Sequence, residues 1–345
     1  HRFSKPRVGG SNPPERAKSK IYMIKNILVT GGAGYIGSHI IEILIKKKKN
    51  IFIVDNLSTG HKRLINKKAQ FFKLDILKTN KLKEIIIKYK IDSIIHLAAN
   101  LIIGEGEKKP KAYFKNNVTG TKSVLDALKD TKVKSFLFSS TAAIYKDGNY
   151  RVTENSQIKP KSIYGKTKLK AENLIRINCK KLKINYGILR YFNIAGASPT
   201  GKIGLLNKSD NLFKNFSNQI VKKNPVLKIY GTDYKTKDGS CIRDFIHVYD
   251  VAEIHLKVLE KINKLNVSKI LNCGYNKGVS VLEVAKEFKN QSFKNVKIFK
   301  TNRRKKDIVK IIASNNKLKN FINWKPKYNS LNKIVRSCLI WEKKI

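Results

Sequence analysis

The fold is decided by the stretch Thr30-Gly31-Gly32-Ala33-Gly34-Tyr35-Ile36-Gly37. It follows a short apolar run at 27–30 and opens an amphipathic stretch at 36–47, so it lies where a strand turns into a helix. The three glycines at 31, 34 and 37 let the backbone turn tightly, approach a pyrophosphate and pack the helix on the sheet. A helix N-terminus at this point also favours negative charge. The stretch therefore predicts a dinucleotide-binding turn in a doubly wound fold.

The rest of the chain supports this fold class, because short apolar runs alternate with amphipathic stretches. We expect strands at 27–30, 51–55, 71–74, 93–97, 135–139, 186–190 and 270–273, and helices at 36–47, 82–88, 112–129 and 164–180. Strand-helix-strand order with β-branched strands predicts an α/β protein with a doubly wound parallel sheet. Beyond Asn193 the regularity gives way to loops and shorter elements, which indicates a smaller C-terminal substrate-binding lobe.

These patterns suggest a division of the chain. We expect a Rossmann-type NAD-binding domain at 23–193 and a lobe at 194–345, with a part near 240–280 returning to the sheet. Residues 1–22 are rich in Pro, Gly, Ser and basic residues, so we expect a disordered extension foreign to the fold.

The composition is strongly basic, with a formal net charge of +49. The 73 cationic residues are 62 Lys and 11 Arg, and the lysines occur throughout the chain rather than in one tract. A solvated lysine surface is therefore favoured over a nucleic-acid-binding face, although the charge can steer anionic ligands. No apolar run approaches the ~20 residues of a membrane span, so we expect a cytoplasmic protein. The four cysteines match neither a zinc site nor a disulfide framework, and we expect no metal.

Asp55 ends the second predicted strand, where a carboxylate can accept hydrogen bonds from both hydroxyls of an adenosine ribose. Its charge would repel a 2′-phosphate, so NAD is favoured over NADP. The alternative interpretation is an aspartate that only caps a turn or helix.

Tyr164 and Lys168 are four residues apart, which places them on one face of a predicted helix. A tyrosine has an unperturbed pKa of ~10, so it needs neighbouring cations to act as a base, and Lys168 and a bound nicotinamide would supply them. Ser140 and Thr141 end another predicted strand with hydroxyls that can hold a sugar hydroxyl. Alone, the Tyr-Lys pair is also compatible with an exposed surface pair.

Together, these motifs resemble the extended short-chain dehydrogenase/reductase family, and the resemblance runs from about residue 25 to 341. Further segments are similar to its UDP-galactose 4-epimerase branch: Asp55-Asn56-Leu57-Ser58, His96-Leu97-Ala98-Ala99, Leu189-Arg190-Tyr191-Phe192-Asn193, Gly231-Thr232-Asp233-Tyr234 and Arg243-Asp244-Phe245-Ile246-His247-Val248.

The resemblance implies a set of ligand-binding residues. NAD would be bound by Gly31, Gly34, Tyr35, Ile36, Gly37, Asp55, Asn56, Asp75, Ile76, Leu97, Ala98, Ala99, Asn116, Tyr164, Lys168, Tyr191 and Phe192. The UDP-sugar would be bound by Thr141, Asn193, Asn211, Leu212, Tyr230, Arg243, Arg304 and Asp307. Arginines at 243 and 304 suit a diphosphate because a guanidinium can bind two oxygens at once.

The sequence also departs from the family pattern at several positions. Leu101 stands where a lysine near the cofactor phosphates is common, and Lys146 replaces the usual glycine. An expected Arg-Arg-x-Gly-Asp reads Arg303-Arg304-Lys305-Lys306-Asp307, and the position thought to gate sugar size reads Ile311.

The resemblance implies the interconversion of UDP-glucose and UDP-galactose. Tyr164 would take the proton of the sugar 4′-hydroxyl while hydride passes from C4′ to NAD; the 4-keto sugar would turn and be reduced on its other face. The family also implies a homodimer that pairs the helices expected at 112–129 and 164–180.

Several alternatives remain open from the residues. Sugar dehydratases of this family carry an Asp-Glu pair where this chain has Ala142 and Ala143, and the related decarboxylase has a glutamate at the second position. Epimerases of UDP-N-acetylglucosamine, UDP-xylose/arabinose or UDP-glucuronate share the motifs. A non-enzyme that senses NAD or binds nucleic acid is a further alternative, against which the retained Tyr-Lys pair argues.

Overall fold

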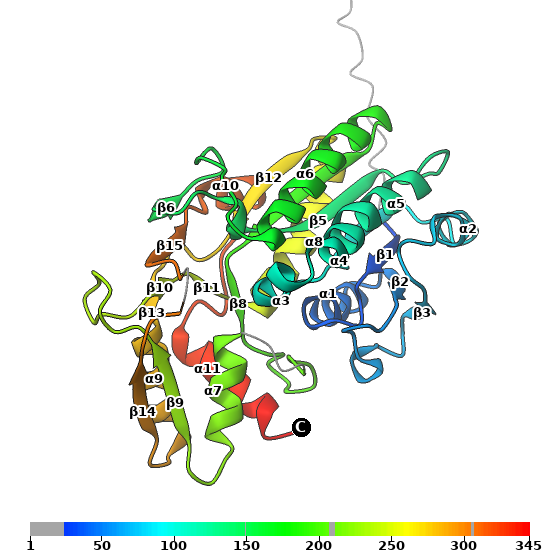
Figure 1. Cartoon of the computed structure of the whole chain (residues 1–345). Helices are drawn as coiled ribbons and strands as arrows, with labels where there is room; N and C mark the ends of the chain where they lie inside the picture. The colour runs from blue at the N-terminus through cyan, green and yellow to red at the C-terminus, as the bar shows by residue number, and fades with distance from the viewer. Residues whose placement is uncertain (1–23, 149, 207–210, 305–306) are drawn as a thin grey trace, which may run out of the picture.

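The fold centres on a parallel sheet of seven strands (Figure 1). The computed structural model describes residues 24–148, 150–206, 211–304 and 307–345. In spatial order the strands are β12 (Lys269–Cys273), β7 (Asn185–Tyr191), β5 (Ser135–Thr141), β4 (Ser93–His96), β1 (Asn26–Thr30), β2 (Asn50–Asp55) and β3 (Gln70–Lys73). All six neighbouring pairs are parallel. The predicted doubly wound sheet is confirmed, and all seven strands expected from the sequence belong to it.

Helices cover both faces of this sheet. Apolar side chains of α1 (Tyr35–Lys46), α8 (Val248–Leu265) and α10 (Asn316–Ile322) pack on one face. Those of α2 (Thr79–Lys88), α5 (Gly120–Ala127) and α6 (Ile163–Lys181) pack on the other. Strands buried on both faces read as continuous apolar runs, as the sequence of β1 and β2 does.

The helix expected at 112–129 is present, but it is not α-helical throughout. It consists of α4 (Pro110–Phe114), one turn of π-helix at Lys115–Thr119, and α5. Within the π-helical turn, Asn117 accepts a hydrogen bond from the backbone N–H of Asn100 at 2.7 Å and donates one to Thr167 at 3.1 Å. The wide turn therefore points an amide into the interior, between the sheet edge and α6. The short α3 (Ile103–Lys108) precedes it.

The remaining elements form the C-terminal lobe around a separate apolar core. Its helices are α7 (Leu212–Ile220), α9 (Val281–Ser292) and α11 (Leu331–Glu342), which pack with the parallel pair β9 (Val226–Tyr230) and β14 (Lys297–Thr301). A four-stranded sheet contains β13 (Val279–Ser280), β10 (Ile242–Arg243), β15 (Lys310–Ala313) and β6 (Arg151–Val152), and a two-stranded one contains β11 (Phe245–His247) and β8 (Asn193–Ala195). Figure 1 shows α7, α9, α11, β9 and β14 grouped below β8, in the lower left of the view.

One long helix in this half of the chain has no counterpart among the expected elements. We expected loops and shorter elements after Asn193, with a part near 240–280 returning to the sheet, and α8, which has 18 residues, lies in that part and covers the large sheet. Its apolar residues recur at helical spacing, since Val248, Val251, Ile254, Val258 and Ile262 are all buried. This spacing in the sequence could have predicted α8.

Two expectations from composition can be compared with the structure. All four cysteines are free and buried. No helix in the described part of the chain is long and apolar enough to span a membrane.

Candidate active site

A cavity of about 1110 Å³ lies between the carboxyl ends of the sheet strands and the C-terminal lobe. In the sheet, β1 lies between β2 and β4, so the strand order reverses at β1. A crevice forms at the carboxyl ends of the strands at such a reversal. Nearly all the residues expected to bind ligand line it: Gly31, Gly34, Tyr35, Ile36, Gly37, Asp55, Asn56, Ile76, Leu97, Ala98, Ala99, Asn116, Ser140, Thr141, Tyr164, Tyr191, Phe192, Asn193, Asn211, Leu212, Tyr230, Arg243, Arg304 and Asp307. The two expected residues that do not line it are Asp75 and Lys168.

The glycine turn after β1 leaves no room for a side chain at Gly31 or Gly37. Gly31 has a φ of +73°, and a Cβ there would lie 2.7 Å from the backbone nitrogen of Ala98. A Cβ on Gly37 would lie 2.5 Å from the carbonyl oxygen of Gly31. The turn therefore exposes backbone and the N-terminus of α1 to the cavity, as a pyrophosphate requires.

Asp55 stands beside this turn at the end of β2. One carboxylate oxygen accepts a hydrogen bond from the N–H of Ala33 at 3.0 Å, and the other from the N–H of Leu57 at 2.8 Å. Burial raises the pKa of Asp55, and these two N–H groups oppose the rise. Each oxygen keeps acceptor capacity on the cavity side, which fits the vicinal hydroxyls of an adenosine ribose.

Asp75 acts behind this site rather than in it. One of its oxygens accepts from the side-chain amide of Asn56 at 3.1 Å, and the other from the N–H of Leu77 at 2.9 Å. The aspartate therefore orients Asn56, while its neighbour Ile76 lines the cavity.

Tyr164, in the first turn of α6, lies near Thr141 at the end of β5. Burial raises the pKa of Tyr164 to about 12, and the hydrogen bond from Thr141 opposes the rise. Thr141 also accepts from the N–H of Ala143 at 3.1 Å, which fixes its side chain. In the protein without ligand the tyrosine is therefore a neutral phenol, and it needs added positive charge in the cavity to become a base.

Lys168 lies one turn further along α6 and is 1% exposed. Its ammonium donates to the carbonyl oxygen of Ser139 at 2.7 Å and lies 4.6 Å from the ring centre of Phe138. Burial lowers the pKa of Lys168 to about 7, and the charge of Glu172 opposes the shift. Lys168 thus lies behind the cavity wall, and its pKa is close to neutral pH.

Ser140 has a different orientation from Thr141. Its hydroxyl donates to the carboxylate of Glu172 at 2.5 Å, and its side chain is 1% exposed. Since a hydroxyl has only one proton, this arrangement leaves Ser140 able to accept a hydrogen bond from a ligand but not to donate one.

Cationic side chains cover the lobe side of the cavity. Arg243 donates to the carboxylate of Asp307 at 2.5 Å, and the guanidinium of Arg304 lies 4.2 Å from the ring centre of Tyr230. Both arginines face the cavity from the lobe, opposite the glycine turn, so a second anion can bind there. Lys305 and Lys306 lie outside the described residues.

Two positions that depart from the family pattern have clear surroundings. Leu101 lines the cavity and is 55% exposed, so it offers apolar surface where a lysine was expected. Ile311 is buried and packs with Ala142, Ile144 and Phe192 instead of lining the cavity.

The sequence analysis missed several residues of the cavity wall. Lys228 on β9 was detectable, because it stands two positions before Tyr230 in an alternating strand and so shares its face. Asp147 and Lys161, which form an ion pair at 2.7 Å, come from two loops whose approach no local pattern indicates. Behind the wall, and outside the cavity lining, Glu172 was detectable as the next residue after Tyr164 and Lys168 at intervals of four.

Comparisons with known proteins agree with this geometry. The profile described as NAD dependent epimerase/dehydratase family matches residues 27–274. The chain is 35% identical over 319 residues to a UDP-glucose 4-epimerase of Lactobacillus helveticus, covering 92% of this chain and 97% of that protein.

Solved structures give the same result. A UDP-glucose-4-epimerase from Stenotrophomonas maltophila, with bound NAD and formylated UDP-arabinopyranose, has a TM-score of 0.89 at 31% identity, with 93% of this chain and 98% of that one covered. The UDP-Glc/GlcNAc 4-epimerase of Campylobacter jejuni has a TM-score of 0.81 at 36% identity, with 93% and 100% covered.

Proposed function

Because the chain belongs to the NAD-dependent epimerase/dehydratase family, we propose that it is a UDP-sugar 4-epimerase that interconverts UDP-glucose and UDP-galactose. One observation carries the proposal: Tyr164 with Thr141 faces the same cavity as the glycine turn with Asp55 and the arginines of the lobe. A dinucleotide on the first side and a nucleoside diphosphate on the other would meet at the tyrosine.

The residues of the chain have separate tasks in this reaction. Tyr164 removes the proton of the sugar 4′-hydroxyl and later returns it, while Thr141 binds the same hydroxyl. NAD, when bound, would supply the hydride chemistry at C4′ without net oxidation of the sugar. The neutral phenol of Tyr164 would lose its proton where the ammonium of Lys168 and the positive charge of a bound nicotinamide lower its pKa.

The cavity wall argues against elimination of water from the sugar. Ala142 and Ala143, which follow Thr141, carry no acid or base, and Ala142 belongs to an apolar cluster with Phe192. A dehydratase needs an additional acid and base beside C5 and C6.

Other UDP-sugars are the second candidates, and one observation favours them. The Campylobacter jejuni relative, at 36% identity, is named as a UDP-Glc/GlcNAc 4-epimerase. Leu101 and the ion pair of Asp147 with Lys161 line this chain's own cavity and can change which sugars fit.

A panel of UDP-sugars tests the proposal. We expect purified protein to convert UDP-galactose to UDP-glucose in an assay coupled to UDP-glucose dehydrogenase, and to convert UDP-N-acetylgalactosamine or UDP-arabinose more slowly. If only an N-acetylated, pentose or uronate sugar is converted, the 4-epimerase assignment stands and the glucose assignment is wrong. No conversion of any sugar, together with DNA binding that weakens as salt increases, would instead favour the non-enzyme alternative.

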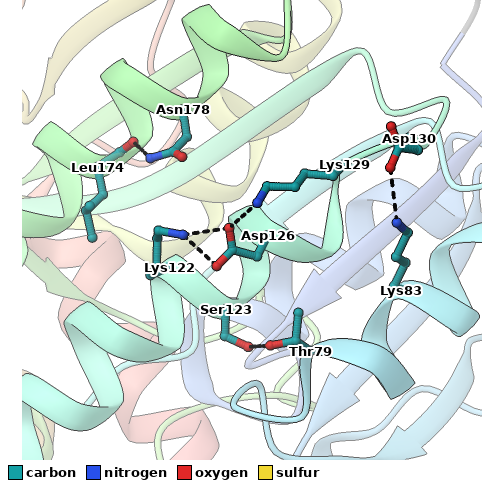
Figure 2. A network of polar contacts seen from close by, with 9 residues as sticks. All are labelled: Thr79, Lys83, Lys122, Ser123, Asp126, Lys129, Asp130, Leu174 and Asn178. Carbon is teal, nitrogen blue, oxygen red and sulfur yellow. Dashed lines mark hydrogen bonds and ion pairs between the residues drawn. The ribbon is translucent and has the colours of Figure 1, made fainter.

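We also propose that two copies pair through α5 and α6 and that the enzyme works in the cytoplasm. The lysines on this surface are partly neutralised: Figure 2 shows Lys122 and Lys129 on either side of Asp126, at 2.6 and 3.3 Å. Ile177 on α6 is 55% exposed and offers apolar surface to a second copy.

A further inference from the structure

A chain of buried polar side chains runs behind the cavity, from β5 through α6 to β7. Ser140, Glu172 and Arg190 are 1%, 2% and 3% exposed. The guanidinium of Arg190 binds both carboxylate oxygens of Glu172, at 3.1 and 2.8 Å. Ser140 donates to the first of these oxygens at 2.5 Å. Glu172 thus has three hydrogen bonds and no contact with the cavity.

The network continues beyond Arg190. The same guanidinium donates to the phenol oxygen of Tyr145 at 3.0 Å, and that phenol donates to Asn272 of β12 at 2.6 Å. Three strands of the sheet and the helix that carries Tyr164 are therefore joined through one carboxylate. A buried ion pair is not in itself evidence for stability, so its position calls for another explanation.

The position of Glu172 relative to the catalytic groups gives that explanation. Tyr164, Lys168 and Glu172 follow one another at intervals of four on α6, and so lie on the same face. Ser140 lies between Ser139, whose carbonyl accepts from Lys168, and Thr141, which binds Tyr164. The bond from Ser140 to Glu172 therefore ties the end of β5 to α6 between the two contacts that orient Lys168 and Tyr164.

We propose that Glu172, held by Arg190, is a positioning residue for the epimerase reaction, which fixes the end of β5 through Ser140 and places a negative charge one helical turn from Lys168. The inference rests on the proposed function. It assigns a task to a carboxylate that touches neither sugar nor cofactor.

The charged and titratable groups around Lys168 determine what this carboxylate does. From β4, His96 faces it and is neutral, because burial and the charge of Lys168 lower the pKa of the histidine to about 3. On α6 the neighbours are Tyr164 and Glu172, and on β7 Arg190 is paired with Glu172. Glu172 is therefore the one negative charge among the described groups that opposes the loss of the lysine proton through burial.

Three substitutions separate the two tasks of Glu172. Glu172→Gln removes the charge and keeps an oxygen acceptor for Ser140. Glu172→Asp keeps the charge but is too short to reach both Ser140 and Arg190. Ser140→Ala removes only the connection to β5. As a matched control, Glu342→Gln breaks the buried ion pair with Lys214, at 2.9 Å, between α11 and α7 in the lobe.

The experiment is the pH profile of kcat for each variant with bound NAD. Without the charge of Glu172 the pKa of Lys168 falls. We therefore expect the alkaline limb of the kcat–pH profile of Glu172→Gln to shift to lower pH by about one unit. Glu172→Asp and Ser140→Ala should keep the parent's limb but lower kcat by about tenfold or less at every pH, with KM little changed. Glu342→Gln should lose thermal stability without a shift of the limb.

Each outcome decides the inference. A parent-like limb in Glu172→Gln, or equal losses in Glu172→Gln and Glu172→Asp at all pH values, means that the carboxylate is only structural. If Ser140→Ala has the kcat of the parent, the hydrogen bond from Ser140 to Glu172 does not position the end of β5, and that part of the proposal is wrong. If Glu172→Gln does not fold, the double variant Glu172→Gln, Arg190→Met removes the unpaired charge and is expected to show a shift of the alkaline limb in the same direction. Failure of the parent to convert any UDP-sugar would count against the proposed function instead.

Discussion

The ammonium of Lys168 donates to the backbone carbonyl of Ser139 at 2.7 Å and does not line the cavity. Lys168 is thus fixed to the strand that ends in Thr141, not to Tyr164. Since its pKa is about 7, it is partly neutral at physiological pH in the ligand-free protein. Tyr164 is then a neutral phenol and Lys168 is only partly charged until ligand arrives, so we expect the activation of Tyr164 to depend on NAD binding.

The first prediction concerns the cofactor. We expect purified protein to carry tightly bound NAD(H), because a cofactor that is regenerated in every cycle has no need to leave. Asp55→Asn keeps one acceptor oxygen but loses the charge, so it should weaken NAD binding by about tenfold or more and reduce the discrimination against NADP.

Nicotinamide released on denaturation measures this occupancy, and titration of stripped protein gives the affinities. Asp75→Asn is the matched control, since Asp75 orients Asn56 without lining the cavity and should have a smaller effect. A protein that releases no nicotinamide and shows no affinity for added NAD would contradict the assignment of the glycine turn.

The second prediction separates two adjacent parts of the lobe. Arg243 lines the cavity and pairs with Asp307, whereas Arg303 pairs with Asp233 at 2.7 Å outside it. Arg243→Lys loses the bidentate geometry, so KM for the UDP-sugar should rise by about tenfold or more with little change in kcat. Arg303→Lys should behave like the parent. Equal effects of the two substitutions would mean that Arg243 does not contact the diphosphate.

The third prediction concerns the assembly. Light scattering at micromolar concentration should give about twice the chain mass of 39.4 kDa. Ile177→Glu places a charge on the exposed face of α6 and should yield monomers, while Phe293→Glu changes a side chain that is 97% exposed in the lobe and should leave the mass unchanged. Because both copies are basic, the dimer should be weaker at low salt. A parent of single-chain mass would refute the proposed pairing.

The sequence predicted the parts of the site that depend on local backbone geometry. A tight turn requires its glycines, and a residue at the end of a strand, such as Asp55, must lie at the edge where ligands bind. The Tyr164 position follows from helical spacing in the same way. All three line the cavity.

The other parts depend on contacts between distant segments. Ser140 and Thr141 are adjacent at a strand end, where side chains alternate, and only the packing of α6 determines that Thr141 binds Tyr164 while Ser140 binds Glu172. The same holds for Lys168, whose partner is a backbone carbonyl that no side-chain pattern identifies. The Arg190 pair with Glu172 joins residues 18 positions apart.

The last prediction tests the proton transfer itself. Tyr164→Phe keeps the ring and its packing and removes only the phenol oxygen, so the binding of NAD and UDP-sugar should remain largely intact. Turnover should collapse, because general acid-base groups contribute about 10²–10⁴-fold and here one oxygen both removes and returns the proton. The loss in kcat is measured by quenching reactions with saturating UDP-galactose at successive times.

Lys168→Ala is the informative comparison. It should lower the rate as well, but it should also weaken NAD binding, which separates the task of the lysine from that of the tyrosine. Removing Lys168 also frees the carbonyl of Ser139, so retained NAD and a parent-like melting temperature must be checked for both variants. If Tyr164→Phe interconverted UDP-glucose and UDP-galactose at close to the parent rate, the tyrosine could not be the base. Ser140, Thr141 or a bound water would then have to accept the proton.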